Sequence, residues 1–284
     1  KDWLGGNESA TPTATDLETL RNRSRAANRN FALARGATDT MSFNVVGEGL
    51  RPQPLLSAER MGITEDYAEA LREQIEAAWD LWTPYADSAN ILTFDEIQFL
   101  GITKVIEDGE VFGLPTWADD SWRTLGRALE VVEADRVQTP TDKVRLSTLA
   151  HGIEYGFKRG EPRGYWIAKE QDKTGTYRLR SDKFVRIPAR DGAGRPKVLH
   201  AFPTRRPSQM RGVPFFAPIL GLFKHLTDYL EAEVVLARVA ACLGVFITQN
   251  DPIAGAIGNT NSRQSGTNAR IQRISPGMVG YLNK

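Results

Sequence analysis

The chain has 284 residues, of which 41% are hydrophobic and 25% are charged, and both fractions are typical of globular proteins. These fractions exclude a wholly disordered or fibrous chain. The 36 lysines and arginines nearly balance the 35 acidic residues, which argues against a surface that coats nucleic acid by charge alone. We expect one large domain or two smaller ones.

The single cysteine excludes an internal disulfide, and no apolar run reaches the length of about 18 residues that a membrane helix needs. We therefore expect no membrane partner. The chain begins at Lys1 rather than at a methionine, and residues 278–282 at its other end have the pattern of a strand. We interpret the sequence as a fragment of a longer chain.

The first elements are an arm and a basic helix. Residues 5–16 are small and polar and include a proline, and we predict a flexible N-terminal arm at residues 1–15. Asp16 is a suitable N-cap for a helix that runs to about Met41, with apolar residues on one face and arginines elsewhere. Residues 42–46, SFNVV, alternate briefly before the glycines at 47 and 49, which predicts a short strand and a turn.

Two further helices have clear start signals. Thr64 precedes a run in which Tyr67, Ile75 and other apolar residues recur at helical spacing, and Pro84 ends it. The residues from Thr93 to Glu96 form a capping box for a second helix, which we expect to end before Asp108.

Between residues 110 and 202 the pattern changes to short β-rich runs separated by Gly, Pro and Asp. Because helices precede these strands rather than alternate with them, the predicted fold class is α+β.

Apolar residues then recur at steps of three and four from Gly212 to Gly244, which predicts one long helix of roughly 45 Å. Pro218 must mark its true start or kink its first turn. Residues 245–248 predict a strand, and residues 250–270 predict a mobile Gly/Asn/Ser-rich loop. The charged residues on the other faces of the helix are Lys224, Asp228, Glu231, Glu233 and Arg238.

No motif for nucleophilic, nucleotide-binding or metal chemistry is present, so we assign no catalytic residue, cofactor or metal. Acidic clusters leave one alternative open, a metal-dependent nuclease, for which Glu110 and Asp135 are the first residues to mutate. Arginines can bind phosphates or acidic neighbours, or they can lie on solvated or intersubunit faces, and the balanced charge favours the solvated or intersubunit interpretation. The arginines in question are Arg21, Arg23, Arg25, Arg205, Arg206 and Arg211.

Several segments in order resemble the lambda-type family of tailed-bacteriophage portal proteins, the head–tail connectors. The first is LRNRSRAANRNFALARGATDTMSFNVVGEGL, and FLGITKVIEDGEVF, GIEYGFKRGEPRGYWI, VRIPA and VLHAF follow. The most specific is RRPSQMRGVPFFAPIL, which leads into the long helix and AEVVLARVAACLGVFI. Together they extend across most of the chain.

The resemblance implies a structural, non-enzymatic subunit of a homo-oligomeric ring, expected to be twelve-fold, at one capsid vertex. It implies a wing at residues 16–212, a stem helix at 213–244 and the start of a small α/β clip at 245–284. Double-stranded DNA would pass through the channel during packaging and ejection. The implied partners are the major capsid protein, the packaging terminase and a neck or tail connector protein, with assembly in the host cytoplasm and final location in the virion. A capsid adaptor without a channel stays open as a second alternative.

Overall fold

The computed structural model describes residues 14–156, 161–169, 181–207, 209–242, 245–249 and 279–283. The chain divides into two units, Lys1–Leu220 and Gly221–Lys284, each of which we describe by itself. The structure contains helices and mainly antiparallel sheets, which confirms the α+β class. The predicted arm, apart from residues 14 and 15, and the predicted loop at 250–270 lie outside the described residues.

The basic N-terminal segment forms two helices, α1 (Ala14–Asn30) and α2 (Ala32–Val46), where the sequence predicted a single helix starting at Asp16. The chain breaks at Phe31, whose backbone is extended. The predicted strand at 42–46 is also wrong, because these residues complete α2. Its buried residues follow a four-residue spacing that outweighs the brief alternation. They are Ala34, Thr38, Ser42 and Val46.

Helix α3 (Ala58–Met61) is a single turn, and α4 (Glu65–Trp82) begins as predicted, since the Thr64 side chain accepts a hydrogen bond from the Tyr67 amide at 3.3 Å. A 3₁₀ turn, η1 (Thr83–Tyr85), contains Pro84 and ends it. Ala68 is the one buried residue of α4. The apolar spacing therefore predicted the helix correctly, but it did not predict that apolar residues such as Tyr67 and Ile75 are exposed.

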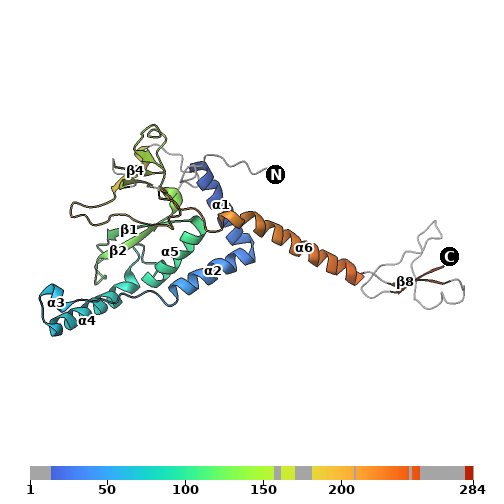
Figure 1. Ribbon diagram of the computed structural model, residues 1–284, viewed down its shortest axis with the longest axis horizontal. Helices are drawn as coiled ribbons and strands as arrows, with labels where there is room; N and C mark the ends of the chain where they lie inside the picture. Colours follow the sequence, from blue (N-terminus) through green and yellow to red (C-terminus); the bar gives the residue numbers. More distant parts are fainter. Residues whose placement is uncertain are drawn as a thin grey trace. The chain divides into compact units, whose positions relative to one another are not determined.

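Helix α5 (Phe94–Asp108) has the predicted capping box. The Thr93 amide donates to the Glu96 carboxylate at 2.8 Å, and the Glu96 amide donates to the Thr93 hydroxyl at 3.3 Å. Helices α1, α2 and α5 pack against one another, and α5 also contacts the first strand (Figure 1).

Two antiparallel sheets complete the first unit. In one, β1 (Val111–Trp117) lies between β2 (Arg127–Val132) and β7 (Leu199–Ala201). In the other, the strands follow chain order: β3 (Leu149–Ala150), β4 (Ile153–Tyr155), β5 (Pro162–Ala168) and β6 (Phe184–Pro188).

A shared apolar core joins the two sheets. Phe112 of β1 lies in it with Tyr165 of β5, at 6.0 Å between ring centroids. Because residues of both sheets fill this core, the two sheets form one packed body. Short 3₁₀ turns, η2 (Ala134–Arg136) and η3 (Ser181–Lys183), lie in the connections.

The long helix α6 spans Leu220–Cys242, preceded by the 3₁₀ turn η4 (Ala217–Ile219) that contains Pro218. The predicted start at 213 is therefore wrong, and Pro218 marks the true start. Its 23 residues give a length of roughly 35 Å. The first unit extends to Leu220, beyond the predicted boundary at 212. Arg211 forms an ion pair with Glu110 in this unit, and the Phe215 amide donates to the Ile106 carbonyl.

In the second unit, the two strands predicted at residues 245–248 and 278–282 are confirmed. Strand β8 (Val245–Gln249) pairs in parallel with β9 (Val279–Asn283). The wing, stem and clip assignments stay predictions.

Candidate functional site

Glu110 is fully buried at the point where three parts of the first unit meet. Its side chain accepts hydrogen bonds from Arg21 and from Arg211, whose Nε lies 2.8 Å and 2.9 Å from the two carboxylate oxygens. His200 Nε2 lies 2.9 Å from Oε2, and the Gly212 amide donates to Oε2 at 3.0 Å. One carboxylate, immediately before β1, therefore joins α1, β7 and the segment that leads to α6.

These partners decide the charge of Glu110. Burial alone would raise its pKa, but Arg211, the hydrogen bond from His200 and Arg21 outweigh burial and hold the pKa well below its usual range. Glu110 is ionised at neutral pH, and its charge is compensated inside the fold.

Arg211 uses its remaining donors on backbone carbonyls. Its Nη1 donates to Val137 at 2.8 Å and to His151 at 2.5 Å, and its Nη2 donates to Ala134 at 2.8 Å. The guanidinium also lies over the Phe112 ring, 5.2 Å from its centroid. A planar fork with five donors suits this arrangement, which lysine could not reproduce.

A second row of ion pairs lies beside Glu110. Arg25 is bound to Asp108 through two hydrogen bonds of 2.7 Å and 2.9 Å, and to Asp135 at 2.5 Å. Arg21 also binds Asp135, at 3.1 Å. We call Arg21, Arg25, Arg211, Asp108, Glu110 and Asp135 the buried ion cluster; it holds three arginines and three carboxylates, so its formal charges cancel.

His200 completes this balance because desolvation by burial lowers its pKa, which keeps it neutral at pH 7. Its ring stacks on Phe112 with 4.2 Å between centroids. A neutral imidazole adds no charge to the cluster.

We expect the free energy of unfolding to fall in two stages as the pH is lowered from 7. The pKa of folded His200 lies below the ordinary 6.5, so the unfolded chain takes up the proton first and stability declines below pH 6.5. The lowered pKa of Glu110 stabilises the fold above the ordinary 4.5, and this stability is lost as the pH falls from there toward the folded pKa. Urea unfolding of the wild type and of His200→Gln at stepped pH checks this: the first stage should be smaller in the variant, in which only His151 keeps a pKa lowered by desolvation. An identical decline in both above pH 4.5 would contradict it.

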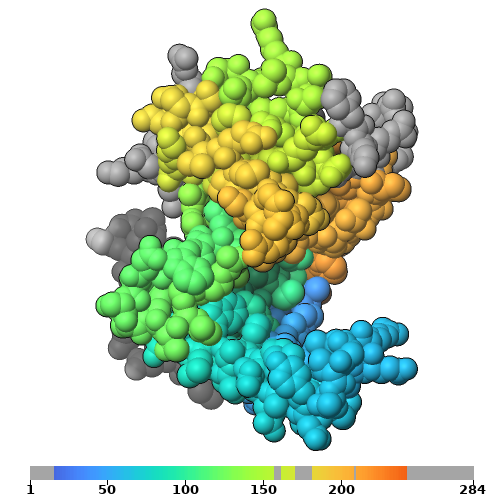
Figure 2. All heavy atoms as spheres, turned by 90° about the vertical axis from the view of Figure 1, so that its left-hand side faces the viewer, coloured from blue at the N-terminus to red at the C-terminus, as the bar shows by residue number. Residues whose placement is uncertain are grey.

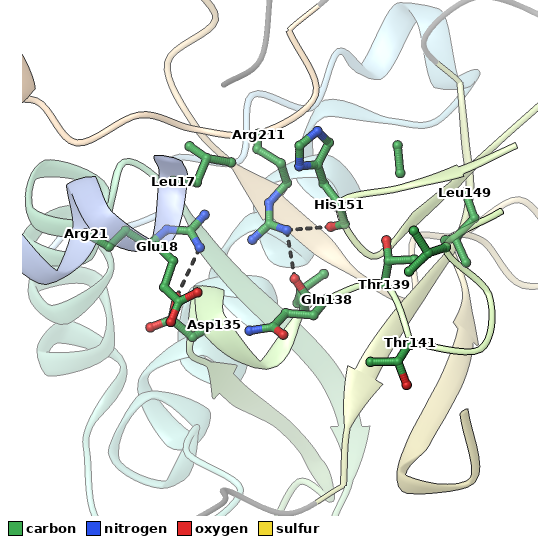
Figure 3. Close-up of a pocket in the computed structure, with 13 residues that line it drawn as sticks. Leu17, Glu18, Arg21, Asp135, Gln138, Thr139, Thr141, Leu149, His151 and Arg211 are labelled. Carbon is green, nitrogen blue, oxygen red and sulfur yellow. Dashed lines mark hydrogen bonds and ion pairs between the residues drawn. The ribbon is translucent and has the colours of Figure 1, made fainter. Parts of the chain in front are cut away.

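A cavity of about 470 Å³ lies beside the buried ion cluster (Figure 3). Arg21 and Arg211 line it together with Asp135 and Thr139, but both guanidinium groups are already bound to the chain. Within the part of the chain that the structure describes, the buried Nδ1 atom of His151 has no hydrogen-bond partner, and desolvation lowers the pKa of this histidine. The two arginines and Asp135 in the cavity wall are thus bound to the chain.

The nuclease alternative depended on Glu110 and Asp135, and both carboxylates are held by arginines. Within the described ranges, no group of three or more His, Cys, Asp or Glu residues could hold a metal ion. Their position therefore supports a structural role for both carboxylates.

The six candidate arginines divide into two groups. Arg21 and Arg211 are buried and Arg25 is half-buried, all three in the buried ion cluster, so the expectation that Arg21 and Arg211 reach phosphates or another subunit is corrected by their burial. Arg23, Arg205 and Arg206 are exposed. Arg205 lies over Phe215, 5.8 Å from the ring centroid. The sequence did not predict that Glu110 binds Arg21, Arg211 and His200. The one local signal was its position directly after Gly109, the glycine that ends α5.

The five charged residues of α6 are all exposed, and so are its large apolar residues other than half-buried Leu220 and Phe223. Leu222, Tyr229 and Leu236 are 63%, 59% and 60% exposed. At about 100° per residue, Lys224, Asp228, Glu231 and Arg238 fall on one side of the helix, and Glu233 falls on the opposite, apolar side. In the described part of the chain none of the five forms an ion pair. None of the described helices is long and apolar enough to cross a membrane.

Comparison with known proteins identifies the family. The family described as "Phage portal protein, lambda family" matches residues 1–284. The portal protein of Escherichia phage N15 is 24% identical over 278 residues, covering 93% of this chain and 51% of the relative. The probable portal protein of Halomonas phage phiHAP-1 is 25% identical over 277 residues, covering 94% and 50%. Portal protein B of Escherichia phage lambda is 24% identical over 223 residues, covering 76% and 41%.

The chain thus spans about half the length, or less, of the curated relatives it matches. The match over the whole chain nevertheless carries the assignment, which confirms the resemblance seen in the ordered segments. This chain belongs to the lambda family of phage portal proteins, which are structural components of the virion rather than enzymes.

Proposed function

We propose that this chain is part of one subunit of a closed ring at a single capsid vertex, with α6 as the stem helix beside the channel. The observation that supports the ring is the exposure of α6. Fourteen consecutive residues, 228–241, are exposed, and they include Leu230 and Val234 at 49% and 50%. Apolar area left in water on this scale is typical of a surface that other subunits cover.

The two sides of α6 suggest how the helices would be arranged. The charged side carries two positive and two negative residues, so it has no net charge. Such a surface suits a channel through which DNA must slide, because many fixed phosphate contacts would hold the DNA in place. The apolar side, with Leu226 and Leu230, is suited to packing against neighbouring stem helices.

The finer parts of the function rest on family membership alone. We propose a twelve-fold ring that conducts double-stranded DNA during packaging and ejection and assembles in the host cytoplasm. Its proposed partners are the major capsid protein, the packaging terminase and a neck protein, the last two meeting the clip that contains β8 and β9. Exposed Arg23 is a candidate for an intersubunit or phosphate contact.

Electron microscopy and native mass measurement of the full-length protein test this proposal. We expect closed rings with an opening wide enough for duplex DNA. The variant Leu226→Glu/Leu230→Glu should lose the rings, since it places charges on the apolar side of α6. A control, Lys224→Gln on the charged side, should keep them. A protein that stays monomeric contradicts the ring, and a closed ring without an opening would favour the adaptor instead.

A further inference from the structure

The net charge of the whole chain is only +1, but the chain has two strongly charged surfaces of opposite sign. Helix α4 carries six carboxylates and one basic residue, Arg72, and its net charge is −5. Residues 181–206 carry seven lysines and arginines against Asp182 and Asp191, and their net charge is +5. All six carboxylates of α4 and all seven basic residues of the second segment are exposed. We call these the acidic surface and the basic surface.

Both surfaces belong to the first unit, and they lie toward opposite ends of it. Figure 2 shows α3 and α4, in blue and cyan, at the lower end of one face and residues 181–206, in yellow to gold, from the upper part to the middle. Their separation means that one subunit cannot neutralise its own acidic surface with its own basic surface.

Many of these charges have no ionic partner within the described residues. On α4, Asp66, Glu73 and Glu76 form no such ion pair, and on the basic surface the same holds for Lys183 and Lys197. These side chains are therefore available to a partner.

Apolar groups accompany the charges on both surfaces. On the acidic surface Tyr67 and Ile75 are 60% and 37% exposed, and on the basic surface Val185 and Leu199 are each 43% exposed. Association could bury these groups while the charges around them set the orientation.

We propose that the acidic surface of one copy docks on the basic surface of the next copy around the ring. This inference rests on the proposed ring and specifies its contact. A contact that joins two different surfaces repeats from subunit to subunit and closes into a ring when the rotation permits. A two-fold contact would also pair the acidic surface of each copy with the basic surface of the other, but it would close after two copies and leave neither surface free to continue a ring. DNA could bind the basic surface alone, but it would leave the acidic surface without a partner, whereas a second copy satisfies both.

The test exchanges the charges in the full-length protein. One variant, Glu73→Lys/Glu76→Lys/Asp80→Lys, changes the net charge of α4 from −5 to about +1. The other, Lys183→Glu/Arg190→Glu/Lys197→Glu, changes the net charge of residues 181–206 from +5 to about −1. Glu48→Lys, at an exposed carboxylate outside both surfaces, is the control. Thermal unfolding of each variant checks that it folds.

At low ionic strength we expect each exchanged variant alone to lose at least about tenfold in ring yield, and Glu48→Lys to lose none. An equimolar mixture should regain rings, because each variant then meets a complementary surface on the other. Native mass measurement should find equal numbers of the two.

Wild-type ring yield from either variant alone, or no recovery in the mixture, would overturn the docking contact and leave the ring itself intact. If Lys183→Glu/Arg190→Glu/Lys197→Glu formed normal rings but lost DNA binding, the basic surface would be a nucleic-acid surface and the proposal would be wrong. If the wild type formed no ring, the proposed function would fail, and pairwise association of the two variants would still decide the contact.

Discussion

Replacement of Glu110 by glutamine is expected to lower the free energy of unfolding by about 3–5 kcal/mol, the usual cost of removing one partner from a buried ion pair. Glutamine has nearly the same shape but no charge. Arg211 forms its ion pair with Glu110, and no second carboxylate pairs with it among the described residues, so its guanidinium would stay buried and uncompensated. Chemical denaturation followed by circular dichroism measures the change.

Glu107→Gln is the matched control, since it makes the same substitution three positions earlier on α5. Glu107 pairs with Lys104, and the two side chains are 15% and 25% exposed, so the loss of this half-buried pair should cost about 1 kcal/mol. Equal effects of the two substitutions would mean that the buried ion cluster contributes no more than a half-buried pair, contrary to the role assigned to Glu110.

Alanine at Gly212 is expected to destabilise the first unit by at least about 2 kcal/mol, because an added Cβ would overlap the backbone of Gly109. Backbone atoms cannot move aside as the end of a flexible side chain can. The reciprocal change, Gly109→Ala, meets the backbone of Val213 and also places alanine at a φ of +89°, which favours glycine. Both substitutions force apart the segment leading to α6 and the junction between α5 and β1.

Gly101→Ala provides the control, since Gly101 lies inside α5 and an added Cβ meets nothing within 4 Å. It should stabilise the chain by roughly 0.5–1 kcal/mol through lower backbone entropy in the unfolded state. Thermal unfolding of the three variants separates the outcomes. A Gly212→Ala protein as stable as the wild type would contradict the close approach of the two segments.

Local signals in the sequence predicted the parts of the fold that depend on local interactions. Thr64 and Thr93 marked helix starts because a side chain can cap an amide only within the same turn. Pro218 left two possibilities for α6, a later start or a kinked first turn, because proline cannot lie inside a regular helix without breaking a hydrogen bond. The structure shows the later start. The strand assigned to residues 42–46 was wrong because a run of five residues is too short to separate the two periodicities.

The candidate site was less accessible to sequence reasoning. A rule based on residue type puts arginines on the surface, and it misassigned Arg21 and Arg211, which are buried. Their partner is distant in the chain, so no spacing pattern pairs them. Likewise, the apolar spacing of α4 and α6 predicted helices, but whether a neighbouring element covers an apolar face depends on tertiary and quaternary packing.

The buried ion cluster also has a consequence for the order of folding. Arg21 and Arg211 lie 89 and 101 residues from Glu110, on either side of it in the chain. Helices α1 and α5 can form early, but Glu110 remains without Arg211 until the chain has been synthesised past residue 211. Contacts of such long sequence separation carry a large loop-closure cost and tend to form late. The first unit should therefore fold in one cooperative step, which is complete only when residues 211–215 have bound. The chain continues into α6 directly from this last-formed part of the unit.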